Sequence, residues 1–329
     1  MSSQQPITPA ADPLGILGTA RRVAEQARAV AIDPAGVARV AGQIASQEIA
    51  PPAWDRTLHW IGAPEATANY ILALDALNFS FWGEPRWVVS YQGQRYNGYW
   101  ALAAALTRAL HAGVPLDDAA FLAGLDAPRL GEILAGEHPI PLLEERAANL
   151  REVGRVLLAR YDGLFARAIK ASGPSAVGLV ELVVRDFPSF RDVARYQGAE
   201  VRFYKRAQIL VSDLYGAFEG EGLGAFPDID RLTAFADYKV PQVLEHLGVL
   251  VYAPALAARI DRLEELPAGG PEEIEIRAAT IWSIELLRQA LAARGRQLAA
   301  FEIDWALWSL GQQLPGTARP YHRTRTIFY

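Results

Sequence analysis

The segment PEEIEIRAATIWSIELLRQALAARG, residues 271–295, predicts a long helix. Acidic residues stand at its start, where the partial positive charge of a helix dipole favours them. We interpret the overlapping run 263–277 as a solvated turn leading into this helix. Segments of helical character fill most of the chain, so the predicted fold class is mainly α. They cover residues 14–32, 34–49, 66–77, 99–113, 117–124, 127–135, 140–170, 174–185, 200–218, 229–250 and 298–314.

One segment predicts β structure. RWVVSYQGQRYNG, residues 86–98, alternates in polarity and breaks at Gln92-Gly93, which is typical of a short hairpin. We expect this small β-hairpin near residues 86–97 and at most one such two-stranded element in the chain. Repeating strand–helix–strand units are absent from the sequence, which argues against a nucleotide-binding parallel sheet. Within the segment 229–250, Pro241 has to lie in a first helical turn or at a kink.

Composition is that of an ordinary globular protein. The 329 residues carry a net charge of −5, and 51% of them are hydrophobic. Residues 1–13 are polar and include prolines, so we expect a disordered N-terminal tail there. Residues 14–329 contain no low-complexity linker, so we expect them to form a single compact helical domain.

Several functions are disfavoured by what the sequence lacks. There is no cysteine, which excludes disulfides, thiolate metal sites and thiol nucleophiles. The five histidines are far apart, so no metal and no cofactor are expected. The slight negative charge argues against direct nucleic-acid binding. Neither a signal-peptide pattern nor a run of about 20 apolar residues occurs, so we expect a cytoplasmic protein with no membrane contact.

Two aspartates stand among aromatic residues. Asp237 lies between Phe235 and Tyr238 in FADYKVPQ, and Asp304 is one helical turn from Trp308 in FEIDWALWSL. An aspartate in an apolar segment is costly unless it is paired, hydrogen-bonded or functional. Each carboxylate is therefore either a capped structural acid or a functional one, suited to stabilising a developing cation or binding the edge of a purine-like base.

Asp213 and His59 have simpler interpretations. Asp213 lies eight residues after Lys205, which places the two on roughly one helix face. A structural acid paired with the nearby basic residues is the favoured interpretation of Asp213. His59 stands between Leu58 and a tryptophan, where a lone histidine is more often structural than a ligand contact.

Stackable rings alternate with small polar groups in LDALNFSFWG, residues 74–83. The rings are Phe79, Phe81 and Trp82, and the polar side chains are Asn78 and Ser80. Such a stretch either contributes to the core or forms a wall for a flat ligand.

The C-terminal HRTRTIFY offers cations for a phosphate. His322, Arg323 and Arg325 are interleaved with threonines, and arginine forks suit phosphate geometry. The alternative is a solvated tail or a strap that pairs with surface acids. The apolar residues 327–329 argue that the tail is packed.

Several of these strings resemble the queuosine salvage protein family when taken together and in order. They are LDALNFSFWGEPRW, FPSFRD, FYKRAQILVSDLYGAF, LTAFADYKVPQVLEHLG, IRAATIWSIELL, IDWALW and HRTRTIFY, which span residue 54 or so to the C-terminus. The resemblance implies an N-glycosidase that hydrolyses queuosine 5′-monophosphate to queuine, a 7-deazaguanine base, and ribose 5-phosphate, for queuine salvage into tRNA modification. It also implies a helical fold distantly similar to the helix-hairpin-helix DNA glycosylases.

The resemblance gives roles to the candidate residues. Asp237 and Asp304 become the catalytic carboxylates; Asp237 is favoured at the sugar and Asp304 at the base or the cyclopentene diol, with the reverse assignment open. Asp213 has a supporting role. The predicted base-binding residues are Asn78, Phe79, Ser80, Phe81, Trp82, Phe235, Tyr238, Trp308 and His59. The predicted phosphate ligands are Lys205, His322, Arg323 and Arg325.

Two other functions remain open. A non-catalytic carrier for a modified nucleobase or nucleotide would share the pocket, but it would not need a carboxylate at the sugar carbon. A DNA-repair glycosylase is disfavoured by the negative net charge.

Overall fold

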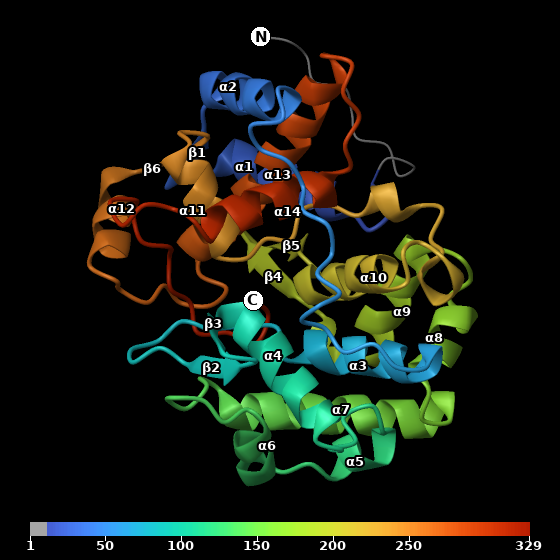
Figure 1. Cartoon of the computed structure of the whole chain (residues 1–329). Coiled ribbons are helices and arrows are strands. Elements are labelled where there is room, and N and C mark those ends of the chain that lie inside the picture. The colour runs from blue at the N-terminus through green and yellow to red at the C-terminus, as the bar shows by residue number, and fades with distance from the viewer. Residues whose placement is uncertain (1–11) are drawn as a thin grey trace. The chain divides into compact units, whose positions relative to one another are not determined.

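The computed structural model describes residues 12–329, and the chain forms two compact units (Figure 1). Over the described residues, unit 1 consists of residues 12–52, Asp192–Lys205 and Asp228–Arg325. Unit 2 consists of Ala53–Arg191, Arg206–Pro227 and Thr326–Tyr329. The single domain expected over residues 14–329 stays a prediction.

Most of the tail expected over residues 1–13, namely residues 1–11, lies outside the described residues. Asp12, the first described residue, is well anchored. Its carboxylate accepts the backbone N–H groups of Leu17 at 3.0 Å and Gly18 at 2.7 Å. These amides belong to the first turn of the first helix, where intrahelical acceptors are lacking. Asp12 therefore stabilises the start of that helix.

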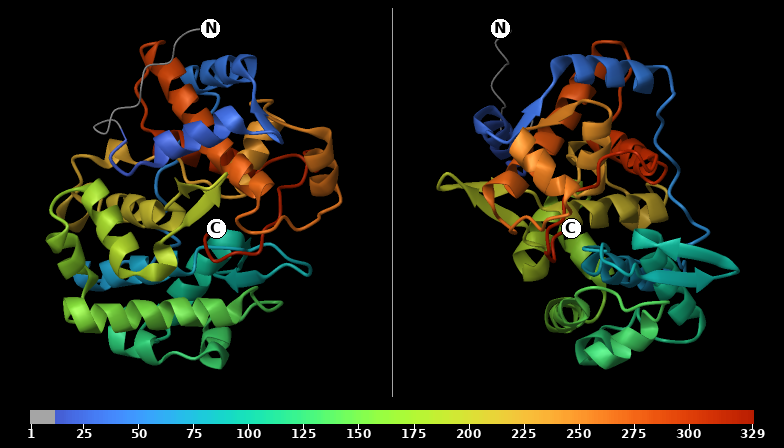
Figure 2. Two further views of the ribbon diagram at one scale, coloured as in Figure 1. Left: turned by 180° about the vertical axis from the view of Figure 1, so that it is seen from behind. Right: turned by 90° about the vertical axis from the view of Figure 1, so that its left-hand side faces the viewer.

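Unit 1 is built around one central helix. α13 (Pro271–Ala292) is buried on most of its surface and packs against α1, α2, α11 and α14. A helix that is buried nearly all round belongs in a core. The three views in Figures 1 and 2 all show α1 and α2 lying against α13. The bounds of the surrounding helices are α1 Ile16–Gln26, α2 Pro34–Ala45, α11 Lys239–His246, α12 Pro254–Asp261 and α14 Ala300–Gly311.

Unit 1 contains a short sheet where the sequence predicts helix. β1 (Val30–Ile32) pairs antiparallel with β6 (Leu250–Tyr252). The helix expected over residues 14–32 ends at Gln26, because the carboxylate of Glu275 accepts the N–H groups of Arg28 and Ala29. The β-branched residues that follow then pair with β6 instead of continuing the helix. The predicted helical state of residues 30–32 and 250 is therefore wrong.

Another correction concerns residues 229–238. They form a short 3₁₀ turn, Ile229–Arg231, and a non-helical run, so α11 begins only at Lys239. Pro241 lies in the first turn of α11, as predicted, where its missing N–H needs no partner. As a result Asp237 lies directly before the start of a helix.

Unit 2 is also mainly helical. α7 (Leu143–Tyr161) packs against α3, α5, α6 and α8. The helix predicted over residues 140–170 is interrupted at Asp162 and Gly163, whose φ angles are 49° and 79°. A left-handed residue pair of this kind ends a helix. The bounds of the other helices are α3 Pro64–Ala76, α4 Gly98–His111, α5 Ala119–Gly124, α6 Ala127–Ile133, α8 Phe165–Ala171, α9 Ala176–Asp186 and α10 Lys205–Ala217, of which Lys205 belongs to unit 1.

The predicted hairpin is confirmed in unit 2. β2 (Val88–Tyr91) and β3 (Gln94–Asn97) pair across a turn at Gln92 and Gly93, whose φ angles are 49° and 77°. Positive φ at both central residues matches the right-handed twist of the strands.

An unpredicted hairpin lies in unit 1. β4 (Val193–Tyr196) and β5 (Ala199–Arg202) pair across a second Gln-Gly turn, Gln197 and Gly198. The helix predicted to begin at residue 200 therefore begins at Lys205. Within residues 12–329 there are three two-stranded sheets. The mainly α prediction is confirmed, and the limit of one two-stranded element is wrong.

None of the helices described over residues 12–329 is both long enough and apolar enough to cross a membrane.

Candidate active site

Asp237 is held in front of α11. The residue is 8% exposed, and Oδ1 accepts the backbone N–H groups of Lys239 and Val240, both at 2.8 Å. Burial raises the pKa of Asp237, while the positive charge of Lys205 and these two N–H groups oppose the rise. Two N–H groups and a positive charge thus offset part of the cost of burying the Asp237 carboxylate.

Asp304 lies on α14 and is 3% exposed. Its Oδ2 accepts the backbone N–H of Phe235 at 2.9 Å, which links α14 to the loop that carries Asp237. Burial raises the pKa of Asp304 well above its ordinary value, and the negative charge of Asp237 raises it further. The N–H of Phe235 and the charge of Lys205 oppose this rise without cancelling it.

The two carboxyls therefore form an unequal pair. Two like charges in one buried site do not both ionise freely, so the pair tends to keep a proton. Asp237 has two N–H donors, whereas the hydrogen bond described for Asp304 is a single one. We infer that Asp304 is the member that holds the proton more strongly. One member can then act as an anion and the other as an acid.

Lys205 completes this group. It is the first residue of α10 and is 4% exposed, and its charge lowers the pKa of both carboxyls. The sequence predicts Lys205 as a phosphate ligand, and that role stays a prediction. What the structure adds is its electrostatic coupling to Asp237 and Asp304.

The aromatic candidates of unit 1 lie in the loop that carries Asp237 or on α14. Phe235 is buried, and its backbone contacts Asp304. Tyr238 packs against Tyr321 with ring centroids 4.8 Å apart. Trp308 lies on α14 one turn after Asp304 and is partly exposed. Their role in base binding stays a prediction.

The C-terminal cations differ in surroundings. His322 is 2% exposed, and burial together with the charge of Arg277 lowers its pKa to about 3. A neutral imidazole offers a phosphate a hydrogen bond but no full charge. Arg325 is half-exposed and pairs with Glu265 at 2.9 Å. The carbonyl of Arg323 accepts an N–H at 2.7 Å. The tail is packed in this region, and phosphate binding by these residues stays a prediction.

In unit 2 the predicted base-binding loop is largely buried. Phe79 is 1% exposed, with the guanidinium carbons of Arg146 and Arg206 at 4.2 Å and 5.2 Å from its ring centroid. Phe81 stacks on Trp87 with centroids 6.3 Å apart. Trp82 is 5% exposed. Two arginines therefore pack against the ring of Phe79, and base binding by the rings of this loop stays a prediction.

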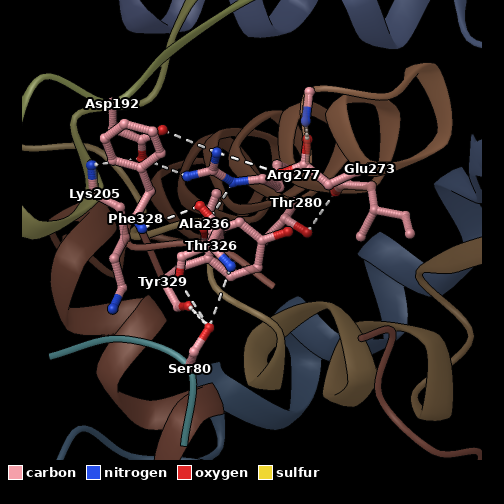
Figure 3. A network of polar contacts seen from close by, with 12 residues as sticks. Ser80, Asp192, Lys205, Ala236, Glu273, Arg277, Thr280, Thr326, Phe328 and Tyr329 are labelled. Atoms are coloured by element: carbon pink, nitrogen blue, oxygen red, sulfur yellow. Dashed lines mark hydrogen bonds and ion pairs between the residues drawn. The ribbon is translucent and has the colours of Figure 1, made fainter. Parts of the chain in front are cut away.

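The polar members of this loop have partners within unit 2. Ser80 adopts φ 39°, and its backbone N–H donates to the carbonyl of Tyr329 at 2.8 Å. The Ser80 hydroxyl donates to the carbonyl of Thr326 at 2.8 Å, as Figure 3 shows. The Asn78 amide donates to Asp75 at 3.3 Å. The sequence points to the loop but not to these contacts.

His59 and Asp213 share a buried network in unit 2. His59 Nδ1 lies within hydrogen-bond distance of the carbonyl of Asp55, and Nε2 lies 2.8 Å from the hydroxyl of Tyr99. That hydroxyl donates to Asp213 at 3.1 Å, and the indole of Trp54 donates to Asp213 at 3.3 Å. Burial lowers the pKa of His59. Asp213 thus accepts hydrogen bonds from two neutral side chains, whereas the sequence predicts basic partners for it.

Sequence reasoning missed Arg277 and Asp192. Arg277 lies on α13, is 2% exposed, and binds both carboxylate oxygens of Asp192 (Figure 3). The turn of the run 263–277 is largely exposed, as expected, but the helix start is not solvated, because Glu273 and Glu275 are buried together with Arg277. An acid four residues before an arginine is typical of an exposed helix face, so the pattern was misleading.

Among residues 12–329 there is no group of three or more histidine, aspartate or glutamate side chains placed to hold a metal ion.

The protein is mainly helical and carries a buried pair of carboxyls, an arrangement that can supply an acid and a base for hydrolysis. Comparison with known proteins agrees with this class. A family model described as queuosine salvage protein matches residues 58–329. The chain belongs to the queuosine salvage protein family.

Three relatives carry the name queuosine 5′-phosphate N-glycosylase/hydrolase. The protein from Sphaerobacter thermophilus is 63% identical over 318 residues, which cover 97% of this chain and 98% of the relative. The Mus musculus protein is 39% identical, with 96% of this chain and 99% of the relative covered. The Schizosaccharomyces pombe protein is 37% identical, with 80% and 83% covered. Similarity thus extends over nearly the full length in the first two.

Proposed function

We propose that this chain hydrolyses the N-glycosidic bond of queuosine 5′-phosphate, releasing queuine and ribose 5-phosphate for queuine salvage into tRNA modification. Family membership and the names of the relatives support the substrate. The observation that carries the chemistry is the buried pair of Asp237 and Asp304 beside Lys205.

Asp237 is the carboxylate at the sugar in this proposal. As the C1′–N bond breaks, its electron pair goes to the base and positive charge develops on the ribose. An ionised Asp237 stabilises that charge and accepts a proton from the water that attacks C1′. The N–H groups of Lys239 and Val240 orient Oδ1, so the carboxylate is preorganised for this task.

Asp304 is the acid that acts on the base. Its raised pKa favours a proton, which it can donate to the departing base. After one turnover Asp237 holds the proton taken from water and Asp304 has lost one. Transfer between the two restores the starting state, so no proton is gained or lost by the enzyme.

Lys205 keeps the pair unequal. Its ammonium group favours the ionised form of Asp237. The negative charge of Asp237 in turn favours the protonated form of Asp304. In unit 1 we retain Phe235, Tyr238 and Trp308 as the proposed stacking residues, since stacking on a base contributes about 1–3 kcal/mol.

The test is incubation of the purified protein with queuosine 5′-phosphate without added metal, followed by mass spectrometry of free queuine. We expect many molecules of queuine per molecule of protein. Asp237→Asn should reduce the rate by about 10²- to 10⁴-fold, because the general base is lost. Saturable queuine binding without any release from the nucleotide would contradict the enzyme and favour a carrier protein.

A further inference from the structure

Arg277 makes an unusual set of buried contacts in unit 1 (Figure 3). Nη1 donates to Oδ1 of Asp192 at 3.0 Å, Nη2 donates to Oδ2 at 2.5 Å, and Nε donates to the carbonyl of Ala236 at 3.1 Å. The guanidinium also lies 3.9 Å from the ring centroid of Phe203 and 3.5 Å from Glu273. All three guanidinium nitrogens therefore donate hydrogen bonds, and one face of the group lies against an aromatic ring.

A buried ion pair is a weak source of stability. The cost of removing both charges from water offsets much of their attraction, and an apolar pair of similar volume is often as stable. The exposed fraction is 3% for the Arg277 side chain and 2% for that of Asp192. A fixed geometry is a better explanation for this pair than net stabilisation.

The contacts lead to two segments of the proposed active site. Ala236 directly precedes Asp237, so the Nε donor of Arg277 restrains the loop that carries this carboxylate. Asp192 Oδ2 accepts the backbone N–H of Lys205 at 3.4 Å. The carbonyl of Asp192 also accepts the N–H groups of Phe203 and Tyr204, both at 3.1 Å. Asp192 thus restrains the start of α10.

We propose that Arg277 is a positioning residue, which holds the Asp237 loop and the Lys205 segment at a fixed separation. The proposal rests on the proposed function, in which Asp237 is the carboxylate at the sugar. Lysine cannot replace arginine here, because an ammonium group lacks the planar fork needed to bind Asp192 and the Ala236 carbonyl together.

Charged groups face both ends of this network. Those around the guanidinium are Asp192, Glu273 and His322. Those around the Asp237 carboxyl are Lys205, Lys239 and Asp304. Lys205 is the first of the charges that lower the pKa of Asp237. A wider separation between Lys205 and Asp237 therefore raises the pKa of Asp237. The charges around the guanidinium affect this pKa only by fixing where Lys205 and Asp237 lie.

The experiment compares the wild type with Arg277→Lys and Asp192→Asn. The acid limb of kcat against pH reports the ionisation of Asp237 in the complex, and we expect it to move to higher pH in both variants. We expect kcat to fall by about 10²-fold, as for a small misplacement of a catalytic group. KM should change much less, because the network is not proposed to contact substrate.

Glu275→Gln is the matched control. Glu275 lies on the same helix, is 3% exposed, and accepts hydrogen bonds from Arg28, Ala29 and Tyr196. This change disturbs a buried network of unit 1 without touching the Asp237 loop or the start of α10. We expect a lower melting temperature and an acid limb in its wild-type position.

A second readout does not depend on activity. Titration of the Asp237 carboxyl by ¹³C NMR, with the signal assigned from Asp237→Asn, should give a higher pKa in Arg277→Lys than in the wild type. An unchanged pKa together with an unchanged acid limb would overturn the positioning role, even if the variant melts earlier. If the wild type releases no queuine, the proposed function fails, and the NMR titration alone then decides the proposal.

Discussion

Asp304 is a residue whose buried state should affect stability as well as catalysis. Its folded-state pKa is raised well above the unfolded value, so between these two values the folded protein binds more protons than the unfolded one. Stability contributed by this group is therefore complete below the unfolded pKa of about 4. It is lost as pH rises through the folded pKa.

Asp304→Asn should remove this loss of stability at high pH. The amide oxygen can still accept the N–H of Phe235, and no charge has to be buried. We expect the variant to have a higher melting temperature than the wild type at neutral pH, and this difference to vanish near pH 4. Melting curves across that range measure it. An equal destabilisation at every pH would show that Asp304 is not held as a buried acid.

Tyr99 offers a test within unit 2. Tyr99→Phe removes a hydroxyl that donates to Asp213 and lies beside Nε2 of His59 in a buried site. We expect the free energy of unfolding to fall by about 1–3 kcal/mol in urea denaturation. The control is Tyr161→Phe, because its partner Asp186 keeps hydrogen bonds from Arg160 and Arg185. Equal losses in the two variants would argue against a buried network of His59, Tyr99 and Asp213.

At the scale of elements, the two Gln-Gly hairpins depend on left-handed glycines. Gly198 has φ 82°, and a Cβ added there would meet no atom within 4 Å, so only the backbone conformation opposes a side chain. Gly198→Ala should lower the free energy of unfolding by about 1–2 kcal/mol.

Gly42 provides the opposite case. It lies inside α2, and a Cβ there would also meet no atom within 4 Å. Gly42→Ala should raise the free energy of unfolding by about 0.8–1 kcal/mol, since alanine is the better helix former. Chemical denaturation of the two variants side by side measures the contrast. A shift of the same sign in both would contradict the assigned conformation of one of them.

Much of the element order could be predicted from local pattern. The helical period gives α13, and the alternation around Gln92 gives the β2–β3 hairpin. β1 and β6 could not be predicted, because each is short and its state depends on a partner far along the chain. The β4–β5 hairpin was within reach, since Gln197-Gly198 repeats the Gln-Gly signal of the first hairpin.

At the scale of the whole chain, both units are assembled from separated segments. The group of Lys205, Asp237 and Asp304 draws on two of the segments of unit 1. The sequence singles out the two aspartates because they stand among aromatic residues. Their electrostatic coupling arises only when the loop and α14 pack together, so local pattern does not reveal it. Arg277 was missed because its burial is likewise a property of the assembled core.

The most direct test of the unequal carboxyl pair is kcat for queuosine 5′-phosphate hydrolysis as a function of pH, in the wild type, Asp237→Asn and Asp304→Asn. Wild-type activity should rise with pH as Asp237 ionises and fall as Asp304 loses its proton. We expect Asp237→Asn to be slower than the wild type by about 10²- to 10⁴-fold and to lack the acid limb. Asp304→Asn should be slower and should lack the alkaline limb. Near-wild-type kcat in Asp237→Asn, or an alkaline limb that persists in Asp304→Asn, would contradict the division of roles.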